Sequence, residues 1–248
     1  MTAEEIQASR TSSVYGFVTV GGGRLRLEDG VVFETNTISL KENTGATLLV
    51  KDATVKGTTI DKKQGESSII VNSGTTLQVE GPSDMDDRTQ LMFTLADAQV
   101  GASALNTTVG AILDVDRLTL NGGSALVMDK TSIDLAGGCL TLLTQGEEKI
   151  NLMLTLDGML MDDSSVVLFS GVDTLDLGAD MQYTGTDLFE FKANQFFTGS
   201  MIGEDTKVHF QNGMVSMSGL ATPVVPEPAT ATLSLLALAG LAARRRRK

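Results

Sequence analysis

The sequence predicts an all-β protein whose body is a β-solenoid (β-helix-like), in which short strands stack as coils along one axis, with a C-terminal hydrophobic helix. Three observations predict this class. Apolar and polar residues alternate from about residue 14 to residue 218, similar strand units recur along that stretch, and proline is almost absent from it. An antiparallel β-sandwich uses strands of the same length and stays open as the alternative.

Alternation with a period of two predicts the strands. It is clear in RLTL at 117–120, SIDL at 132–135, CLTL at 139–142 and TLDL at 174–177. Successive side chains of a strand point to opposite faces, so this period places leucines on one face and hydroxyl or charged residues on the other.

Recurring units predict the coils. LVMDKTSIDL (126–135) aligns with MLMDDSSVVL (159–168), and LLVKDATV (48–55) fits the same frame. Each unit predicts a strand, a tight turn and a second strand, with Asp129 and Asp162 in the turn. The spacing between the units varies, which degenerate stacked coils tolerate.

The scarcity of proline and the presence of Asn-Gly pairs favour different architectures. Pro82 is the only proline before Pro223, which suits strands paired on both edges because such strands cannot spare amide donors. Asn-Gly at 121–122 and at 212–213 favours two-residue hairpin turns. VHFQNGMVSM (208–217) is the best hairpin candidate.

Four segments are predicted: a polar lead-in (1–13), a β-rich repetitive body (14–221), a proline-rich linker (222–228) and a transmembrane sorting tail (229–248). The tail begins with ATATLSLLALAGLAA (229–243), which carries no charge. As a helix this stretch would be about 22 Å long, somewhat short of the roughly 30 Å hydrocarbon core of a membrane. The basic residues that follow would stay on the cytoplasmic side.

The end of the chain resembles a known sorting signal. Pro226-Glu227-Pro228, a leucine- and alanine-rich segment and a terminal basic cluster follow one another, as in the PEP-CTERM signal of Gram-negative bacteria. The resemblance implies that an exosortase, a membrane protease-transpeptidase, recognises Pro226, Glu227 and Pro228 and cleaves near them. It implies a transient inner-membrane anchor at 229–243, and stop-transfer charges at Arg244, Arg245, Arg246, Arg247 and Lys248.

The same resemblance implies that the body ends at the cell surface or outside the cell. The body is also similar, in its pattern of short alternating strands, to autotransporter-like β-helical passenger regions. Export of this kind also uses an N-terminal signal peptide, and MTAEEIQASRTSS has no basic start followed by an apolar run. We therefore expect a truncated or misassigned start, or a fragment of a longer surface protein.

Composition excludes several kinds of site. The net charge of −12, with five basic residues confined to the tail, disfavours nucleic-acid binding. The single cysteine, Cys139, is expected to be a buried small hydrophobe. The single histidine, His209, is expected to have a structural or surface role, and one histidine does not support a histidine-based zinc site or a Ser-His-Asp triad. No cofactor or metal site is predicted.

The remaining candidates for catalytic residues are clusters of acidic side chains. They occur in SDMDDR (83–88), LDVDR (113–117) and MDDS (161–164), where we expect turn and solvent-facing roles. The sequence thus predicts a non-enzymatic, exported structural or adhesin-like protein whose partners are an exosortase, the membrane and an extracellular polysaccharide. The alternative is a β-helical polysaccharide lyase or glycosidase with the same tail, using Asp84, Asp86 and Asp87. A truncated product without independent function is the third option.

Overall fold

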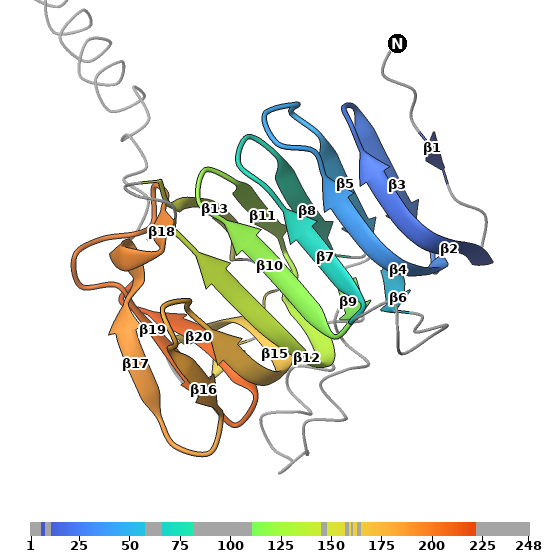
Figure 1. Ribbon diagram of the computed structural model, residues 1–248. Coiled ribbons are helices and arrows are strands. Elements are labelled where there is room, and N and C mark those ends of the chain that lie inside the picture. Colours follow the sequence, from blue (N-terminus) through green and yellow to red (C-terminus); the bar gives the residue numbers. More distant parts are fainter. Residues whose placement is uncertain are drawn as a thin grey trace, which may run out of the picture.

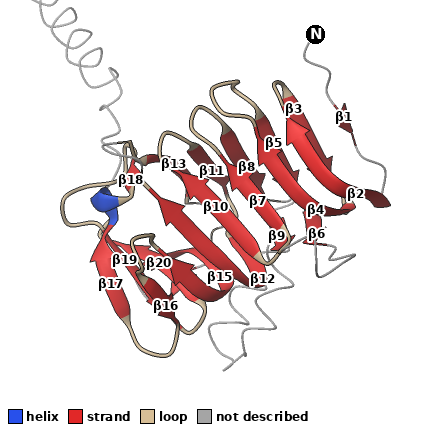
Figure 2. Cartoon of the chain, viewed as in Figure 1, coloured by secondary structure: helices blue, strands red, loops and turns tan. Residues whose placement is uncertain are grey.

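Strands are the main secondary structure of the chain that the structure describes. The computed structural model describes residues 6–7, 11–57, 66–81, 111–144, 148–156, 159, 161–162 and 165–221. These residues form one sheet of seven strands and one of thirteen, with a single 3-10 turn at Ala193–Gln195 (Figures 1 and 2). The predicted all-β class is therefore confirmed. The predicted C-terminal helix lies outside the described residues.

The seven-stranded sheet is parallel throughout, in the order β1-β3-β5-β8-β11-β13-β18. One row of leucines runs across its five central strands in register, and every member is buried. These are Leu25, Leu48, Leu77, Leu126 and Leu152. The strands are β1 (Ile6–Gln7), β3 (Arg24–Glu28), β5 (Thr47–Lys51), β8 (Thr76–Glu80), β11 (Ala125–Asp129), β13 (Ile150–Thr155) and β18 (Phe197–Thr198).

The thirteen-stranded sheet contains long strands that each pair with two shorter ones. β4 (Val32–Leu40) pairs through its first half with β6 (Ala53–Gly57) and through its second half with β7 (Ser68–Val71). β12 (Ile133–Leu143) likewise pairs with β9 (Ala111–Asp114) and β10 (Arg117–Asn121). β2 (Thr11–Val20) and β15 (Ser165–Asp176) flank this parallel region.

The chain passes repeatedly between the two sheets, and it turns a corner at each passage. The corners that follow β3, β5 and β11 contain a residue with positive φ: Asp29 at 58°, Asp52 at 47° and Lys130 at 59°. Such a residue lets the backbone change direction within one or two residues. The strand, turn, strand prediction is thus confirmed for 48–55 and 126–135, although Asp129 is the last residue of β11 and not part of the turn.

Two other turn predictions differ from the structure. Met161–Asp162 (β14) folds back antiparallel on β15, so the unit at 159–168 forms no corner between the sheets. The turn after Asn121 leads from β10 in one sheet to β11 in the other, so the hairpin expected at 121–122 is wrong.

The described part of the chain ends in an antiparallel region. The hairpin predicted at 212–213 is confirmed: β19 (Lys207–Gln211) pairs with β20 (Met214–Ser218). Positive φ at Asn212 (51°) and Gly213 (73°) gives the twist that a two-residue hairpin requires. β20 pairs with β15, β19 with β17 (Phe189–Lys192), and β16 (Gln182–Thr184) with β15. Because the pairs among β1 to β13 are parallel, the antiparallel sandwich alternative is wrong for that region.

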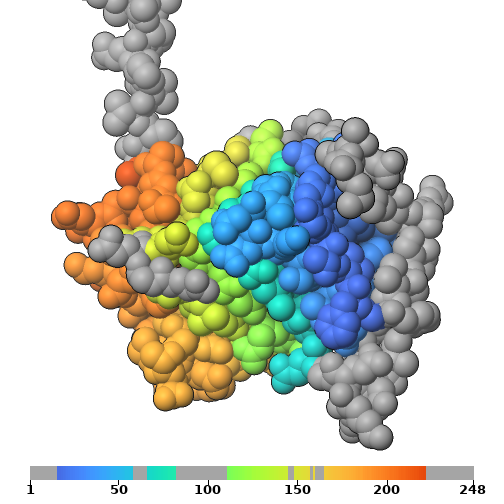
Figure 3. Space-filling model, turned by 45° about the horizontal axis from the view of Figure 1, so that its top comes forward, coloured from blue at the N-terminus to red at the C-terminus, as the bar shows by residue number. Residues whose placement is uncertain are grey.

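One apolar core runs between the sheets from the N-terminal to the C-terminal strands. Its second row is Ile38, Ile69, Leu118, Leu140 and Leu175, which lie in register on five parallel strands and are fully buried. On the surface, the colours from blue to orange follow one another across the molecule, because strands that are close in sequence stack side by side (Figure 3).

Candidate functional site

The residues predicted to direct sorting lie outside the described part of the chain. They are Pro226, Glu227, Pro228, Arg244, Arg245, Arg246, Arg247 and Lys248, together with the apolar segment 229–243. Within the described ranges, no helix has the length and apolar character needed to cross a membrane.

The acidic clusters do not converge on one place in the described chain. The cluster at 83–88 lies outside it, and Asp162 belongs to β14. Asp116 sits at the corner before β10, where its Oδ2 accepts hydrogen bonds from the Ser67 amide (2.7 Å) and hydroxyl (2.8 Å). Asp116 thus joins the corners before β7 and β10, which is a structural role. The described residues contain no cluster of three or more acidic, histidine or cysteine side chains that could hold a metal.

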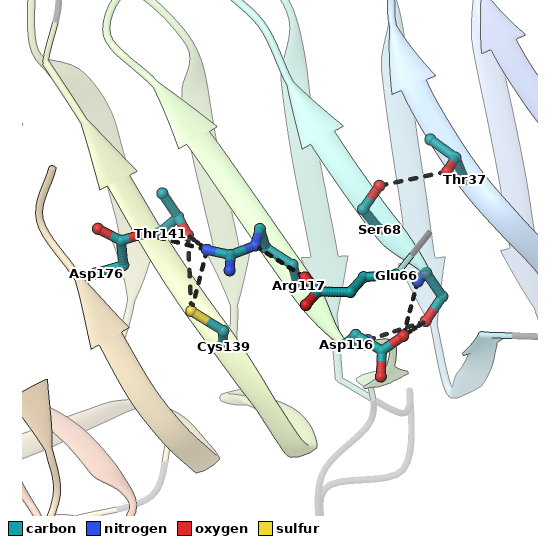
Figure 4. A network of polar contacts seen from close by, with 9 residues as sticks. Thr37, Glu66, Ser68, Asp116, Arg117, Cys139, Thr141 and Asp176 are labelled. Atoms are coloured by element: carbon teal, nitrogen blue, oxygen red, sulfur yellow. Dashed lines mark hydrogen bonds and ion pairs between the residues drawn. The ribbon is translucent and has the colours of Figure 1, made fainter. Parts of the chain in front are cut away.

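A polar network crosses the outer face of three parallel strands, centred on Arg117 of β10 (Figure 4). Its Nη1 donates to Thr141 Oγ1 on β12 at 2.8 Å and lies 3.1 Å from Asp176 Oδ2 on β15. Its Nε lies 3.6 Å from the Glu66 carboxylate. The guanidinium therefore links β10 to β15 across β12.

Cys139 belongs to this network, which corrects the expectation that it is buried. It lies half-buried on the outer face of β12, with Sγ 3.3 Å from Arg117 Nη1. The sequence did contain a signal for this placement. RLTL, CLTL and TLDL form one ladder in register, so Arg117 lies beside Cys139, which lies beside Thr174.

Arg117→Met should lower the free energy of unfolding by about 1 kcal/mol, because the variant keeps the aliphatic stem and loses the hydrogen bonds. Urea unfolding followed by circular dichroism measures the change. Arg24→Met, on an exposed residue at the start of β3, is the matched control and should change stability by less than about 0.5 kcal/mol. Equal effects at both positions would show that the network adds nothing.

Asp134 is the one strongly buried carboxylate among the described residues, with 1% of its surface exposed. Its Oδ1 accepts the Ala136 amide hydrogen at 2.9 Å, while Oδ2 has no partner. Burial raises the pKa of Asp134, and the nearby Asp114 carboxylate raises that pKa further. Ser170 lies directly opposite on β15, and its hydroxyl also has no partner. The structure thus holds two unsatisfied polar groups side by side.

His209 lies on β19 within a second polar cluster, on the outer face of the C-terminal antiparallel region. Its Nε2 is 2.7 Å from Ser218 Oγ, and its Nδ1 is 3.2 Å from Glu190 Oε2. Lys207 donates to the other oxygen of Glu190 at 2.6 Å. Sequence reasoning placed His209 on a strand but did not bring it together with a serine and a carboxylate.

Comparison with known proteins gives a match at the end of the chain. Residues 224–248 match a family model described as the PEP-CTERM protein-sorting motif. The comparisons with curated proteins and with solved structures give no match.

Proposed function

We propose that the β-rich body of this chain is a structural or adhesin-like cargo. The chain carries a PEP-CTERM protein-sorting motif at residues 224–248, which marks a protein that an exosortase sorts to the cell surface. In this proposal 229–243 anchors the precursor in the inner membrane, and cleavage near Pro226 to Pro228 frees the body. An extracellular polysaccharide is the ligand that we propose for it. The sorting motif is the observation that carries the proposal.

The body suits a structural role if it is a β-solenoid, as we propose. Parallel pairing in register supports this architecture: equivalent residues of β5, β8 and β11 stack directly on one another. In a solenoid each coil contacts only its neighbours, so the length of the body sets the distance it spans. The polysaccharide-active enzyme has no comparable support, because Asp84, Asp86 and Asp87, the residues that it would use, lie outside the described part of the chain.

Replacing Pro226, Glu227 and Pro228 by alanine should leave the precursor uncleaved in the membrane fraction, because the enzyme loses the residues it recognises. The full chain would be placed behind a functional export signal in a host that has an exosortase. Immunoblotting of membrane, periplasm and medium then follows the precursor and the cleaved body.

Deleting residues 226–248 is the companion variant and should send the body into the periplasm or medium, since the apolar anchor is lost. Pro223→Ala, in the same linker but outside the Pro-Glu-Pro motif, serves as the matched control and should be cleaved normally. Membrane association of the deletion variant, or normal cleavage of the triple alanine variant, would contradict the proposal.

A further inference from the structure

Three adjacent strands place a serine, a histidine and a glutamate on one face of the C-terminal sheet. β17, β19 and β20 pair in the order β17-β19-β20, with Glu190 opposite His209 and His209 opposite Ser216. Ser218 lies two residues beyond Ser216 and therefore on the same face. The opposite face is apolar and buried by Phe191, Val208, Phe210, Val215 and Met217. The core thus fixes the strands that carry the three polar side chains.

The distances within this cluster are those of a nucleophile, its base and the group that orients the base. Ser218 Oγ lies 2.7 Å from His209 Nε2, and Glu190 Oε2 lies 3.2 Å from His209 Nδ1. With the proton on Nδ1, the nitrogen beside the carboxylate, the neutral imidazole presents Nε2 as an acceptor to the serine hydroxyl. We propose that Ser218 is a nucleophile activated by His209 and that this face hydrolyses short-chain carboxylic esters.

Glu190 is a positioning residue in this arrangement, because it acts through the imidazole. The hydrogen bond from Lys207 lowers the pKa of Glu190, and the charge of Lys207 lowers that pKa further. The carboxylate therefore stays ionised while His209 gains and loses a proton. An ionised partner at Nδ1 holds the ring in the tautomer that serves Ser218 and stabilises the imidazolium that forms.

Lys207 supplies positive charge beside the nucleophile. It lies directly opposite Ser218 in the β19–β20 ladder and on the same face as His209. Attack on an ester carbonyl creates a negative oxygen, and a nearby cation lowers the energy of that state. The strand pairing therefore places the nucleophile, the base and a cation, which the structure pairs with Glu190, on one face of the sheet.

The reaction balances without any further reagent except water. Ser218 Oγ forms a bond to the acyl carbon while its proton passes to His209 Nε2, and the carbon–oxygen bond to the alcohol breaks. His209 returns the proton to the leaving alcohol. Water then attacks the acyl-serine by the same route, which releases the carboxylic acid and restores the hydroxyl.

This inference goes beyond a structural surface role, and it departs from the expectation that the chain is not an enzyme. That expectation rested on the single histidine and on the turn and solvent-facing roles expected for the acidic clusters. The Asn-Gly hairpin nevertheless fixes the pairing of 209 with 216 and of 207 with 218, which brings the histidine near a serine. Glu190 comes from a separate strand and could not be placed from the hairpin.

The test uses the purified full chain in mild detergent, with p-nitrophenyl acetate as substrate and a fluorophosphonate probe. We expect catalytic turnover, and peptide mapping should place the probe on Ser218. Ser218→Ala and His209→Gln should each lower kcat/KM by about a hundredfold or more. Glu190→Gln should lower kcat about tenfold or more with little change in KM, since it acts through the imidazole and not on substrate binding.

Ser216→Ala is the matched control, because Ser216 faces the same side and lies directly opposite His209. It should keep full activity and full labelling at Ser218. Thermal unfolding of each variant separates loss of chemistry from loss of fold. Labelling elsewhere than Ser218, or turnover unchanged in Ser218→Ala, would overturn the inference. Because the assay does not depend on sorting, it can fail or succeed independently of the experiments on the tail.

Discussion

Leu118→Ala should lower the free energy of unfolding by about 2–5 kcal/mol, the usual cost of a large-to-small change in a closed core. Leu118 is fully buried in the row that runs from Ile38 through Ile69 to Leu140 and Leu175. Strands on both sides hold this row in register, so the neighbours cannot collapse into the space that the missing methyl groups leave. Equilibrium unfolding in urea measures the effect.

Thr119→Ala is the matched control for this substitution. Thr119 is the next residue along β10 and faces outward, so its loss should change stability by less than about 0.5 kcal/mol. The urea m-value should stay the same in both variants, because the surface exposed on unfolding is similar. A loss below about 1 kcal/mol for Leu118→Ala would mean that the row relaxes around the cavity, and would contradict a rigid core.

Asp134→Asn should raise the free energy of unfolding at neutral pH by about 1–3 kcal/mol, the cost of a buried polar group without a partner. Asn keeps the oxygen that accepts the Ala136 amide hydrogen. It replaces the unpartnered Oδ2 by an amide group that can donate toward the Ser170 hydroxyl, which lies directly opposite and also has no partner. The variant also removes the charge that burial disfavours.

The effect of Asp134→Asn should depend on pH in a defined direction. Burial raises the pKa of Asp134 above its ordinary value of 3.8, so the folded state holds the proton more tightly than the unfolded state. The stability that this proton contributes is fully present below the ordinary pKa, and it is lost as the pH rises through the folded-state pKa. The advantage of the Asn variant should therefore be smaller at about pH 3.5 than at about pH 7.

Urea unfolding at the two pH values measures this difference. Asp180→Asn, at an exposed turn residue with φ of 63°, is the matched control, and its effect should not grow with pH. An advantage of Asp134→Asn that is the same at both pH values would contradict the raised pKa. A destabilised variant at neutral pH would show that the carboxylate has a favourable role.

Prediction from the sequence succeeded where one local pattern decided the structure. Alternation identified the strands, and Asn-Gly at 212–213 identified the hairpin. The same dipeptide at 121–122 misled, because the residues after it pair with β8 and β13, which lie far away in the sequence. A turn motif fixes the direction of the chain over a few residues, whereas the partner of the following strand depends on the whole stack.

The polar clusters show one misread signal, at Cys139, and one true limit, at Asp134. Cys139 looked like a core residue from its apolar neighbours, but the period of two places it on the outer face with Thr141, and the inward residue is Leu140. Asp134 is a carboxylate in the alternating stretch SIDL, where the pattern predicts that it faces water. In the structure Asp134 is buried. What covers a strand face comes from other parts of the chain, so a strand pattern alone cannot show it.

The three parallel ladders continue without a change of register across the long segment between β8 and β9. β8 stacks on β5 and β11, β7 on β10, and β6 on β9, although residues 81–110 enter the chain between them. Lengthening a connection costs little, about 0.6 kcal/mol for each doubling. A longer or shorter segment between β8 and β9, including the acidic stretch at 83–88, should therefore leave the register of the three ladders unchanged.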